Sequence, residues 1–552
     1  MYFTNKKYFA AKYAVAIAGF CLALLTGCSD DNHKIVSGSS SSVATSSSSS
    51  SVSSSSTSSS SSSHSSSSSS SLTDSPEVGQ WYAPAYGYVL SVSVENNLYK
   101  VKTYSLTKNY CLLQDVASNL LLDELKREYV YSNLVKETLL ESKGEYPPGV
   151  EYEKVEQLPK VCEENLQKVK TDTGYAFDAR KDFEIFWQAF DELYINFELR
   201  GMNWSEVYEE AVKSVGNVKN EEELFEFLSA LIAPLGDRHA VLIRAPLTQE
   251  LAESFTAALE NDETPIFRES RQLILYKKLL NEYLQDLESD SELTDTQIAA
   301  AENYILVNYE KLIDIIFSYA EENSDVEVRA AGKIAWFKTN DNIGYVFIGS
   351  MSDYTEGRST LVSDPASDLA IAEATINEAL KDLEDTKGLI IDVRFNDGGQ
   401  DQVALNYVRH FMSQPQVVYS KFSGSGAWAT PKKEVILDPQ SDNIYLKPTA
   451  VLVSGDTVSA AELFTIAISS LPQVTIIGEP TAGALSDVLV KRLTSDILFG
   501  VSNETYLDAQ GNNYEGGGIP PDIAVPFATP QERNGGYDGG LNAAINWIKR
   551  AP

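Results

Sequence analysis

The sequence predicts a mixed α/β fold, and two patterns carry this prediction. From residue 331 onward, short apolar runs alternate with segments of helical periodicity, which favours a sheet with crossover connections. Ahead of that region, residues 178–232 repeat aromatic and aliphatic side chains at steps of three and four, as amphipathic helices do. We therefore expect an α/β core built from βαβ units, preceded by a helical subdomain and a small N-terminal α+β domain.

Residues 1–27 are predicted to be a signal peptide. Three lysines precede an apolar run at 14–25, which is too short to span a bilayer comfortably. The run ends in Leu25-Thr26-Gly27-Cys28, which resembles the lipobox of bacterial lipoproteins and implies a lipid on Cys28. Ser29 then implies sorting to the outer membrane, with a periplasmic or surface-exposed body in the cell envelope. The alternative is an ordinary secretory signal with a chance cysteine.

Residues 28–76 are predicted to be a disordered linker, since positions 37–71 are almost entirely serine and cannot bury apolar surface. With a lipid anchor, this linker would hold a folded body off a membrane. The chain is acidic, with 44 Lys and Arg against 78 Asp and Glu. Such a charge repels nucleic-acid backbones, so we expect no nucleic-acid partner.

Cysteine and histidine are scarce. Cys111 and Cys162 remain once the leader and the lipid site are set aside, and in an oxidising compartment they could form one disulfide. Two cysteines with so few histidines argue against a structural zinc site. The sequence predicts neither a metal nor a cofactor.

Three segments precede the core. Residues 77–170 are predicted to form a small N-terminal domain, strand-rich to 112 and then helical and charged. Residues 171–245 are predicted to be the helical subdomain, with helices over 178–197, after Trp204 and over 221–232. Residues 246–330 form an acidic helical insert, for which a packing role is favoured over a lid or a substrate-restricting role.

Residues 331–552 are predicted to form the core. Strands are expected at 343–348, 388–393, 449–453 and 474–477, and helices at 369–383, 402–412 and 460–471. Active groups in such sheets gather beyond the strand C-termini, where Gly398-Gly399 and Ser459 both fall.

Ser459 lies where a buried strand turns into a helix. A hydroxyl there has unpaired backbone N–H groups beside it and the positive end of the helix dipole, as an acyl-transfer nucleophile needs. However, Ser459 and Glu462 also fit an S-x-x-E capping box, and from this segment alone the cap is the commoner structure.

The other members of a catalytic set are few. Of four histidines, His33 and His64 lie in the leader and His410 lies within a helix, which leaves His239 in a Gly-Asp-Arg-His turn as the candidate base. Two backbone N–H groups would form an oxyanion hole, offered by Ala460 and by the Gly398-Gly399 pair. The orienting acid is Glu515 or Asp522, and the residues alone do not choose between them.

The motifs resemble those of the C-terminal-processing and tricorn-type serine peptidases, over roughly 178–242 and 331–548. Five motifs occur in the order of that family: Leu235-Gly236-Asp237-Arg238-His239, Ile391-Asp392-Val393-Arg394-Phe395-Asn396-Asp397-Gly398-Gly399, Val458-Ser459-Ala460-Ala461-Glu462, Ile477-Gly478-Glu479-Pro480-Thr481-Ala482-Gly483 and Glu515-Gly516-Gly517-Gly518-Ile519-Pro520-Pro521-Asp522. The resemblance implies a crotonase-like and ClpP-like α/β core. No PDZ-like pattern is seen between 246 and 330.

The family has two catalytic arrangements. The serine–lysine dyad would place its lysine at 484, where this chain has alanine, and Lys491 is a poor substitute. The tricorn-like arrangement uses serine, histidine and glutamate, which implies Ser459, His239 and Glu515. One departure is Arg238, which stands where the tricorn enzyme has a second serine. The sequence therefore does not identify the contact by which Glu515 reaches His239.

Two functions follow. The first is a serine peptidase that hydrolyses peptides or unfolded proteins through an acyl-enzyme, with Gly399 and Ala460 holding the oxyanion. The alternative is a catalytically silent binding module of the same fold, displayed on the envelope by its lipid anchor, because fold alone does not guarantee catalysis.

Overall fold

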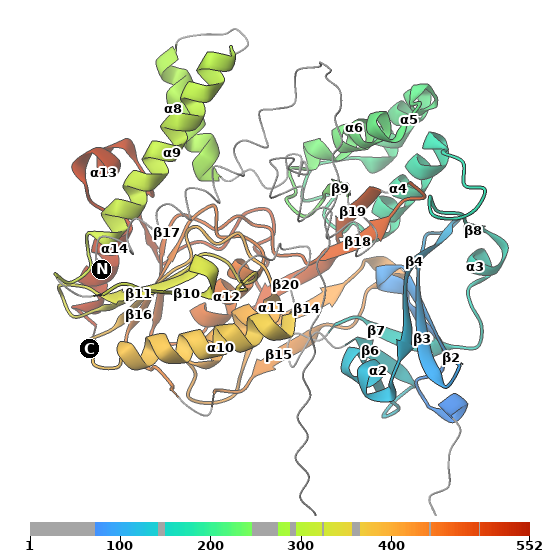
Figure 1. The fold of residues 1–552 in the computed structure, drawn as a ribbon, viewed down its shortest axis with the longest axis horizontal. Helices are drawn as coiled ribbons and strands as arrows, with labels where there is room; N and C mark the ends of the chain where they lie inside the picture. Colours follow the sequence, from blue (N-terminus) through green and yellow to red (C-terminus); the bar gives the residue numbers. More distant parts are fainter. Residues whose placement is uncertain are drawn as a thin grey trace, which may run out of the picture.

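A computed structural model describes residues 72–141, 149–244, 274–287, 294–322, 325–355, 365–440, 443–495 and 497–551 (Figure 1). The predicted signal peptide, Cys28 and nearly all of the predicted linker lie outside these residues. Within them, no helix is both long and apolar enough to cross a bilayer. The predicted mixed α/β class is confirmed.

An eight-stranded sheet occupies the N-terminal part. Its order is β5-β6-β7-β1-β2-β3-β4-β8. The strands are β1 (Gly79–Ala83), β2 (Tyr88–Glu95), β3 (Leu98–Leu106), β4 (Cys111–Leu120), β5 (Tyr129–Ser132), β6 (Thr138–Glu141), β7 (Glu151–Val155) and β8 (Leu166–Gln167), with short helices α2 (Leu122–Glu128) and α3 (Lys160–Glu164). The prediction that 113–170 is mainly helical was wrong. Its charged residues sit on exposed faces of strands, as in β7, where Tyr152 is buried between exposed or half-buried neighbours.

Helices α4 (Ala179–Leu193), α5 (Trp204–Ser214) and α6 (Glu221–Ile232) follow, close to the predicted bounds. The aromatic side chains of α4 pack against a hairpin of the C-terminal half, β18 (Val488–Arg492) and β19 (Ile497–Ser502), with Phe186 and Phe190 against Phe499. The same hydrophobic core continues into the N-terminal sheet. In Figure 1 this hairpin reaches out of the core region toward α4. One core therefore crosses the domain boundaries predicted at 170 and 331.

Polar contacts hold this hairpin at both faces. The buried Asp182 carboxylate of α4 accepts hydrogen bonds from the backbone N–H and hydroxyl groups of Thr494 and Ser495. Lys491 Nζ donates to the carbonyls of Tyr86 and Gly87 at 2.6 and 3.0 Å, and burial lowers the pKa of its ammonium well below the usual value. The amine of Lys491 is thus engaged with the N-terminal sheet.

A seven-stranded sheet forms the centre of the core. Its order is β10-β11-β12-β13-β16-β17-β21, antiparallel from β10 to β12 and parallel from β12 to β21. The strands are β10 (Glu327–Arg329), β11 (Ile334–Lys338), β12 (Gly344–Ile348), β13 (Leu389–Asp392), β16 (Thr449–Val453), β17 (Val474–Gly478) and β21 (Ile523–Ala524). The predicted core strands match β12, β13, β16 and β17. Parallel strands are buried on both faces, which explains their continuous apolar runs.

Helices cover both faces of this sheet. Alternate residues of β12 show why, because Val346 packs into one hydrophobic cluster while Tyr345 and Phe347 pack into the other. The first cluster includes α10 (Pro365–Asp382), α11 (Asp401–Arg409) and α12 (Ala460–Ser469), and the second includes α9 (Asp295–Phe317) and α14 (Gly539–Ile548). A smaller sheet of β15 (Lys433–Leu437), β14 (Gln416–Ser423) and β20 (Glu504–Asp508) packs alongside.

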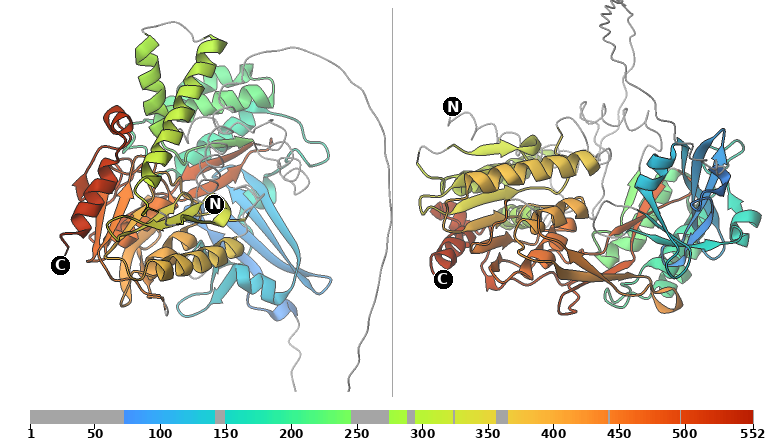
Figure 2. Two further views of the ribbon diagram at one scale, coloured as in Figure 1. Left: turned by 60° about the vertical axis from the view of Figure 1, so that its left-hand side comes forward. Right: turned by 90° about the horizontal axis from the view of Figure 1, so that it is seen from below.

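The predicted helical insert contains two helices in its described part. Helix α8 (Ile274–Leu287) pairs with α9, and the pair projects from the core (Figure 1; Figure 2). Its apolar side chains pack on Phe527 and Ala528, next to the short helix α13 (Pro530–Gly535). Strand β9 (Leu242–Arg244) lies before the insert and joins β19 at the edge of the hairpin.

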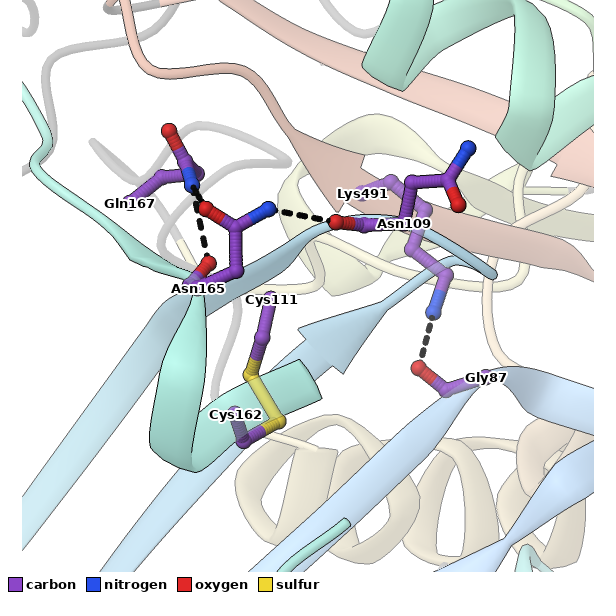
Figure 3. Close-up of a disulfide and its surroundings, with 7 residues drawn as sticks. All are labelled: Gly87, Asn109, Cys111, Cys162, Asn165, Gln167 and Lys491. Atoms are coloured by element: carbon purple, nitrogen blue, oxygen red, sulfur yellow. Dashed lines mark hydrogen bonds between the residues drawn. A yellow bond between two sulfur atoms is a disulfide. The ribbon is translucent and has the colours of Figure 1, made fainter. Parts of the chain in front are cut away.

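A disulfide joins Cys111 at the start of β4 to Cys162 in α3 (Figure 3). Both side chains are buried beside Val89 and Tyr104. The Asn165 side-chain amide donates to the Asn109 carbonyl at 2.6 Å, which adds a second tie between the same two segments. The bridge anchors α3 to β4, the strand beside the β8 edge of the sheet.

Replacing both cysteines by alanine should lower the free energy of unfolding by up to about 4 kcal/mol, because the bridge closes a loop with a sequence separation of 51. Urea unfolding followed by tryptophan fluorescence measures this change. Reductant should destabilise the wild type and leave the double variant unchanged. Equal urea midpoints for the two proteins under oxidising conditions would contradict the prediction.

Candidate functional site

Ser459 stands at a sharp turn between β16 and α12. Its backbone has φ 56° and ψ −123°, a region that residues with a side chain rarely enter. Strain of this kind costs about 1–3 kcal/mol and persists only where the surroundings impose it. The turn leaves the Ser459 side chain half-buried at the end of the parallel sheet. This is the geometry in which a strand-to-helix turn exposes a nucleophile.

The Ser459 hydroxyl does not cap the helix. The N–H of Glu462 donates to the Ser459 carbonyl at 2.8 Å, and the Ser459 side chain makes no cap hydrogen bond. Of the capping box, the hydrogen bond from the Ser459 N–H to the Glu462 carboxylate forms at 3.2 Å. The capping interpretation therefore accounts for Glu462 and leaves the hydroxyl for other chemistry.

Glu462 is a fully buried carboxylate that gathers four donors. Besides the Ser459 N–H, it accepts from the Thr481 hydroxyl at 2.6 Å, the Gly483 N–H at 2.7 Å and the Ala484 N–H at 2.8 Å. Burial raises its pKa, and these hydrogen bonds oppose that rise. Glu462 thus joins the Ser459 turn to the 481–484 loop. Position 484 lies beside the Ser459 turn, and its alanine offers no base.

Two glycines at the end of β13 support the Ser459 turn. Gly398 has φ +101°, and a Cβ built there would lie 2.8 Å from the Ser459 Cβ. The Gly398 N–H already donates to Asn396 Oδ1, so Gly398 supplies close approach and not the oxyanion donor predicted for it. The N–H groups of Gly399, which is exposed, and of Ala460, the first helical residue, have no acceptor among the described residues. These two N–H groups remain as candidate oxyanion donors.

His239 lies in a buried turn that follows α6. Gly236 adopts the left-handed conformation that starts the turn, and Asp237 Oδ1 accepts the His239 N–H at 2.8 Å. Asp237 Oδ2 accepts from the Tyr194 hydroxyl at 2.9 Å, which fixes the turn to the end of α4. After His239 the chain enters β9 and packs on Gly500 of β19, where a Cβ would meet the His239 carbonyl at 2.6 Å.

The structure separates the two candidate acids. Asp522 Oδ2 accepts the Ile476 N–H and so supports the pairing of β21 with β17. Glu515 is buried and accepts from the N–H groups of Leu485 and Ser486 at 2.9 and 3.0 Å. Burial, reinforced by the charge of Asp237, raises the pKa of the Glu515 carboxyl to about 7. Glu515 therefore titrates near neutrality and faces the His239 turn.

The predicted residues fall into two linked groups. Ser459 contacts the glycine pair and Glu462, while Glu515 approaches the His239 turn through Arg200, whose Nη2 is 3.2 Å from Glu515 Oε1. Within the described part of the chain, no hydrogen bond joins the Ser459 hydroxyl to the His239 ring. Such contacts often tighten only when substrate binds.

Sequence reasoning missed two residues near the site. Arg200 follows α4 with no pattern that marks it. Asp456 lies in the Ser459 turn, and its buried carboxylate accepts the N–H groups of Ile274 and Leu275 at the start of α8. Its acidic side chain three residues before the serine was the available signal. The helical insert is thereby fastened to the Ser459 turn.

The remaining polar groups of these motifs are structural. Arg394 is buried between Asp392 and Asp538 and so ties the end of β13 to the start of α14. His410 is fully buried, 3.3 Å from Glu373, as expected for a structural histidine. In the described residues, no group of three or more His, Cys, Asp and Glu side chains could hold a metal ion.

Two family models match the chain. Residues 342–525 match peptidase family S41, and residues 176–233 match the tricorn protease C1 domain. The first match contains Ser459 and Glu515, and the second contains Arg200 and ends shortly before His239. The His239 turn itself lies between the two matched regions.

Curated relatives and solved structures are similar to the chain. It is 27% identical over 169 residues to the carboxy-terminal-processing protease of Bartonella bacilliformis, over 30% of this chain and 38% of that protein. It is 23% identical over 366 residues to the carboxyl-terminal-processing protease of a Synechocystis species, over 61% of this chain and 79% of that protein. The solved structure of the photosystem II D1 C-terminal processing protease is 16% identical, with a TM-score of 0.36, over 64% of this chain and 94% of that chain. The chain thus spans little more than a third of the first of these relatives.

Replacing Gly398 by alanine should displace the Ser459 turn, because the new Cβ would meet Ser459 Cβ and the Val458 carbonyl at 2.8 Å. We expect the free energy of unfolding, measured by urea, to fall by about 1–3 kcal/mol. The reaction of Ser459 with a fluorophosphonate probe should also be lost. Gly216→Ala is the matched control, since its Cβ would meet no atom within 4 Å. Wild-type reactivity in Gly398→Ala would contradict this packing.

Replacing Glu515 by glutamine should change how stability depends on pH. The folded state holds the Glu515 proton up to about pH 7, whereas the unfolded state loses it near 4.5, so wild-type stability falls as pH rises through this window. Relative to Glu515→Gln, the wild type should lose roughly 3 kcal/mol between pH 4.5 and 7.5. Urea unfolding across this range measures the difference, with the exposed Glu210→Gln as control. A pH-independent difference would contradict the raised pKa.

Proposed function

We propose that this chain, a member of peptidase family S41 by its residues 342–525, is a serine peptidase with Ser459 as its nucleophile. His239 acts as general base, and Glu515 orients the imidazole. The N–H groups of Gly399 and Ala460 hold the oxyanion. In this proposal residues 331–552 form a crotonase-like and ClpP-like catalytic core, and residues 171–245 form the helical subdomain that presents the base.

The reaction has two stages. Ser459 Oγ attacks the peptide carbonyl carbon while its proton passes to the His239 ring, and the carbonyl oxygen gains negative charge facing the two N–H groups. The C–N bond then breaks, the amine leaves with the proton from His239, and an ester to Ser459 remains. Water attacks this ester after giving a proton to His239, which returns it to Ser459 as the acid product leaves.

One observation carries the proposal: the strained Ser459 turn leaves the hydroxyl out of the cap while the neighbouring Gly399 and Ala460 N–H groups have no acceptor among the described residues. A purely structural cap would use the hydroxyl and would have no need of a left-handed serine. The absence of a base at Ala484 and the engagement of Lys491 with the N-terminal sheet support a histidine base.

The substrate proposed is a peptide or an unfolded protein, and the place is the cell envelope, with the body tethered by a lipid on Cys28. The disulfide between Cys111 and Cys162 supports an oxidising compartment, since such bonds are rare in the cytosol. The acidic surface supports a protein substrate over nucleic acid.

Labelling with a fluorophosphonate probe tests the proposal, because the probe reacts with an activated serine. The wild type should be labelled and should hydrolyse unfolded protein, while Ser459→Ala and His239→Ala should each lose at least about 1,000-fold in hydrolysis. Ser469→Ala, at the exposed end of the same helix, serves as the control. A folded wild type that is neither labelled nor hydrolytic would favour the binding module instead.

A further inference from the structure

We propose that Arg200 is a positioning residue for the proposed triad, holding the Glu515 carboxylate against the turn that presents His239. The inference rests on the proposed function, and it names the contact through which the acid reaches the histidine turn. Arg200 belongs to the loop between α4 and α5, which is remote in sequence from both partners.

The Arg200 guanidinium spans the gap between two segments. Its Nη2 lies 3.2 Å from Glu515 Oε1 and 3.9 Å from Asp237 Oδ2, and its Nη1 donates to the Gly236 carbonyl at 3.4 Å. The planar fork of arginine suits such a bridge, because separate nitrogens address separate acceptors. Arg200 therefore contacts both the acid and the two residues that open the His239 turn.

Packing around the bridge is close. The Arg200 side chain is 13% exposed, and a Cβ built on Gly516 would lie 3.2 Å from Leu199 Cδ2 and 3.7 Å from Arg200 Nη1. The loop after α4 thus lies against the glycines that follow Glu515. Gly516 in turn donates its N–H to the Gly483 carbonyl, which links the bridge to the loop held by Glu462.

Arg200 supplies positive charge beside Glu515, on which two other carboxylates act. The charges of Asp237 in the His239 turn and Glu462 in α12 add to burial in raising the Glu515 pKa, and the Arg200 guanidinium lies within ion-pair distance of the same carboxyl. Asp237 also accepts from the Tyr194 hydroxyl and the His239 N–H. Without Arg200, Asp237 and Glu515 would approach as like charges in a buried site, which disfavours ionised Glu515. A carboxylate must be ionised to stabilise an imidazolium.

Arg238 does not bridge Glu515 and the His239 turn. It stands next to His239 in sequence, but its charge acts on Asp456 in the nucleophile turn. The departure from the tricorn pattern at 238 is therefore compatible with a Glu515–His239 pairing, because the link runs through Arg200.

The first test needs no activity. Urea unfolding at pH 8 is compared for wild type, Arg200→Met, Glu515→Gln and the double variant. Arg200→Met should lower the urea midpoint of the wild type. In the Glu515→Gln background it should lower the midpoint by less than about half as much, because that background has no Glu515 carboxylate to leave without its cation. Equal shifts in both backgrounds would overturn the bridge. Arg180→Met, a change of an exposed arginine on α4, should leave the midpoint unchanged.

The second test measures how the reactivity of Ser459 depends on pH. In the wild type, the rate of fluorophosphonate labelling should fall as the pH drops and Glu515 gains its proton. In Arg200→Met, the pH at which the rate is half its maximum should be higher by at least about one unit. Arg200→Lys keeps the charge and should restore part of the shift. A wild-type pH profile in Arg200→Met would overturn the positioning role. A wild type unlabelled at every pH would contradict the peptidase function, and the urea midpoints would then decide the bridge alone.

Discussion

The buried carboxylate of Glu462 is the contact on which the site depends. A carboxylate removed from water is costly unless hydrogen bonds replace its hydration, and Glu462 has four donors. Three of them come from the 481–484 loop and one from Ser459. The start of α12, the turn that strains Ser459 and the loop beside it are therefore held by one side chain, and none of these can shift without leaving the charge unsatisfied.

The same loop also connects the Ser459 turn to Glu515. Gly483 and Thr481 pair with the backbone of 516–519, while the N–H groups of Leu485 and Ser486 bind Glu515. Two buried glutamates thus share one loop and differ in setting. Glu462 is enclosed by donors, whereas Glu515 faces a second carboxylate and a single cation. Burial raises the pKa of both, but only Glu515 is placed to respond to the histidine turn.

The sequence predicted the core well, because parallel strands such as Thr449–Val453 are apolar throughout and the helices between them have clear ends. Residues 113–170 were misread because strands such as Glu151–Val155, with the sequence EYEKV, carry charges at three of five positions. In the site, Ser459 and Glu515 were proposed from local motifs and from the family resemblance, and the hydrogen bond from the Ile476 N–H gives Asp522 a structural part instead. Arg200 could not be found, because its partners lie 36 and 315 positions away and nothing in its own loop marks it. Glu462 was seen only as a cap, since its other donors are brought to it by the tertiary fold.

The hairpin of β18 and β19 has a consequence for how the protein is made. Synthesis proceeds from the N-terminus, and domains usually fold as they emerge. Here the helices and the N-terminal sheet share a core with Leu489, Phe499 and Val501, which are synthesised much later than the helices. The aromatic face of α4 therefore completes its packing only after these residues exist, and we expect closure over so long a sequence separation to slow folding. The segment that carries His239 shares its core with β18 and β19, so its packing is complete only after the segment that carries Ser459 has been synthesised.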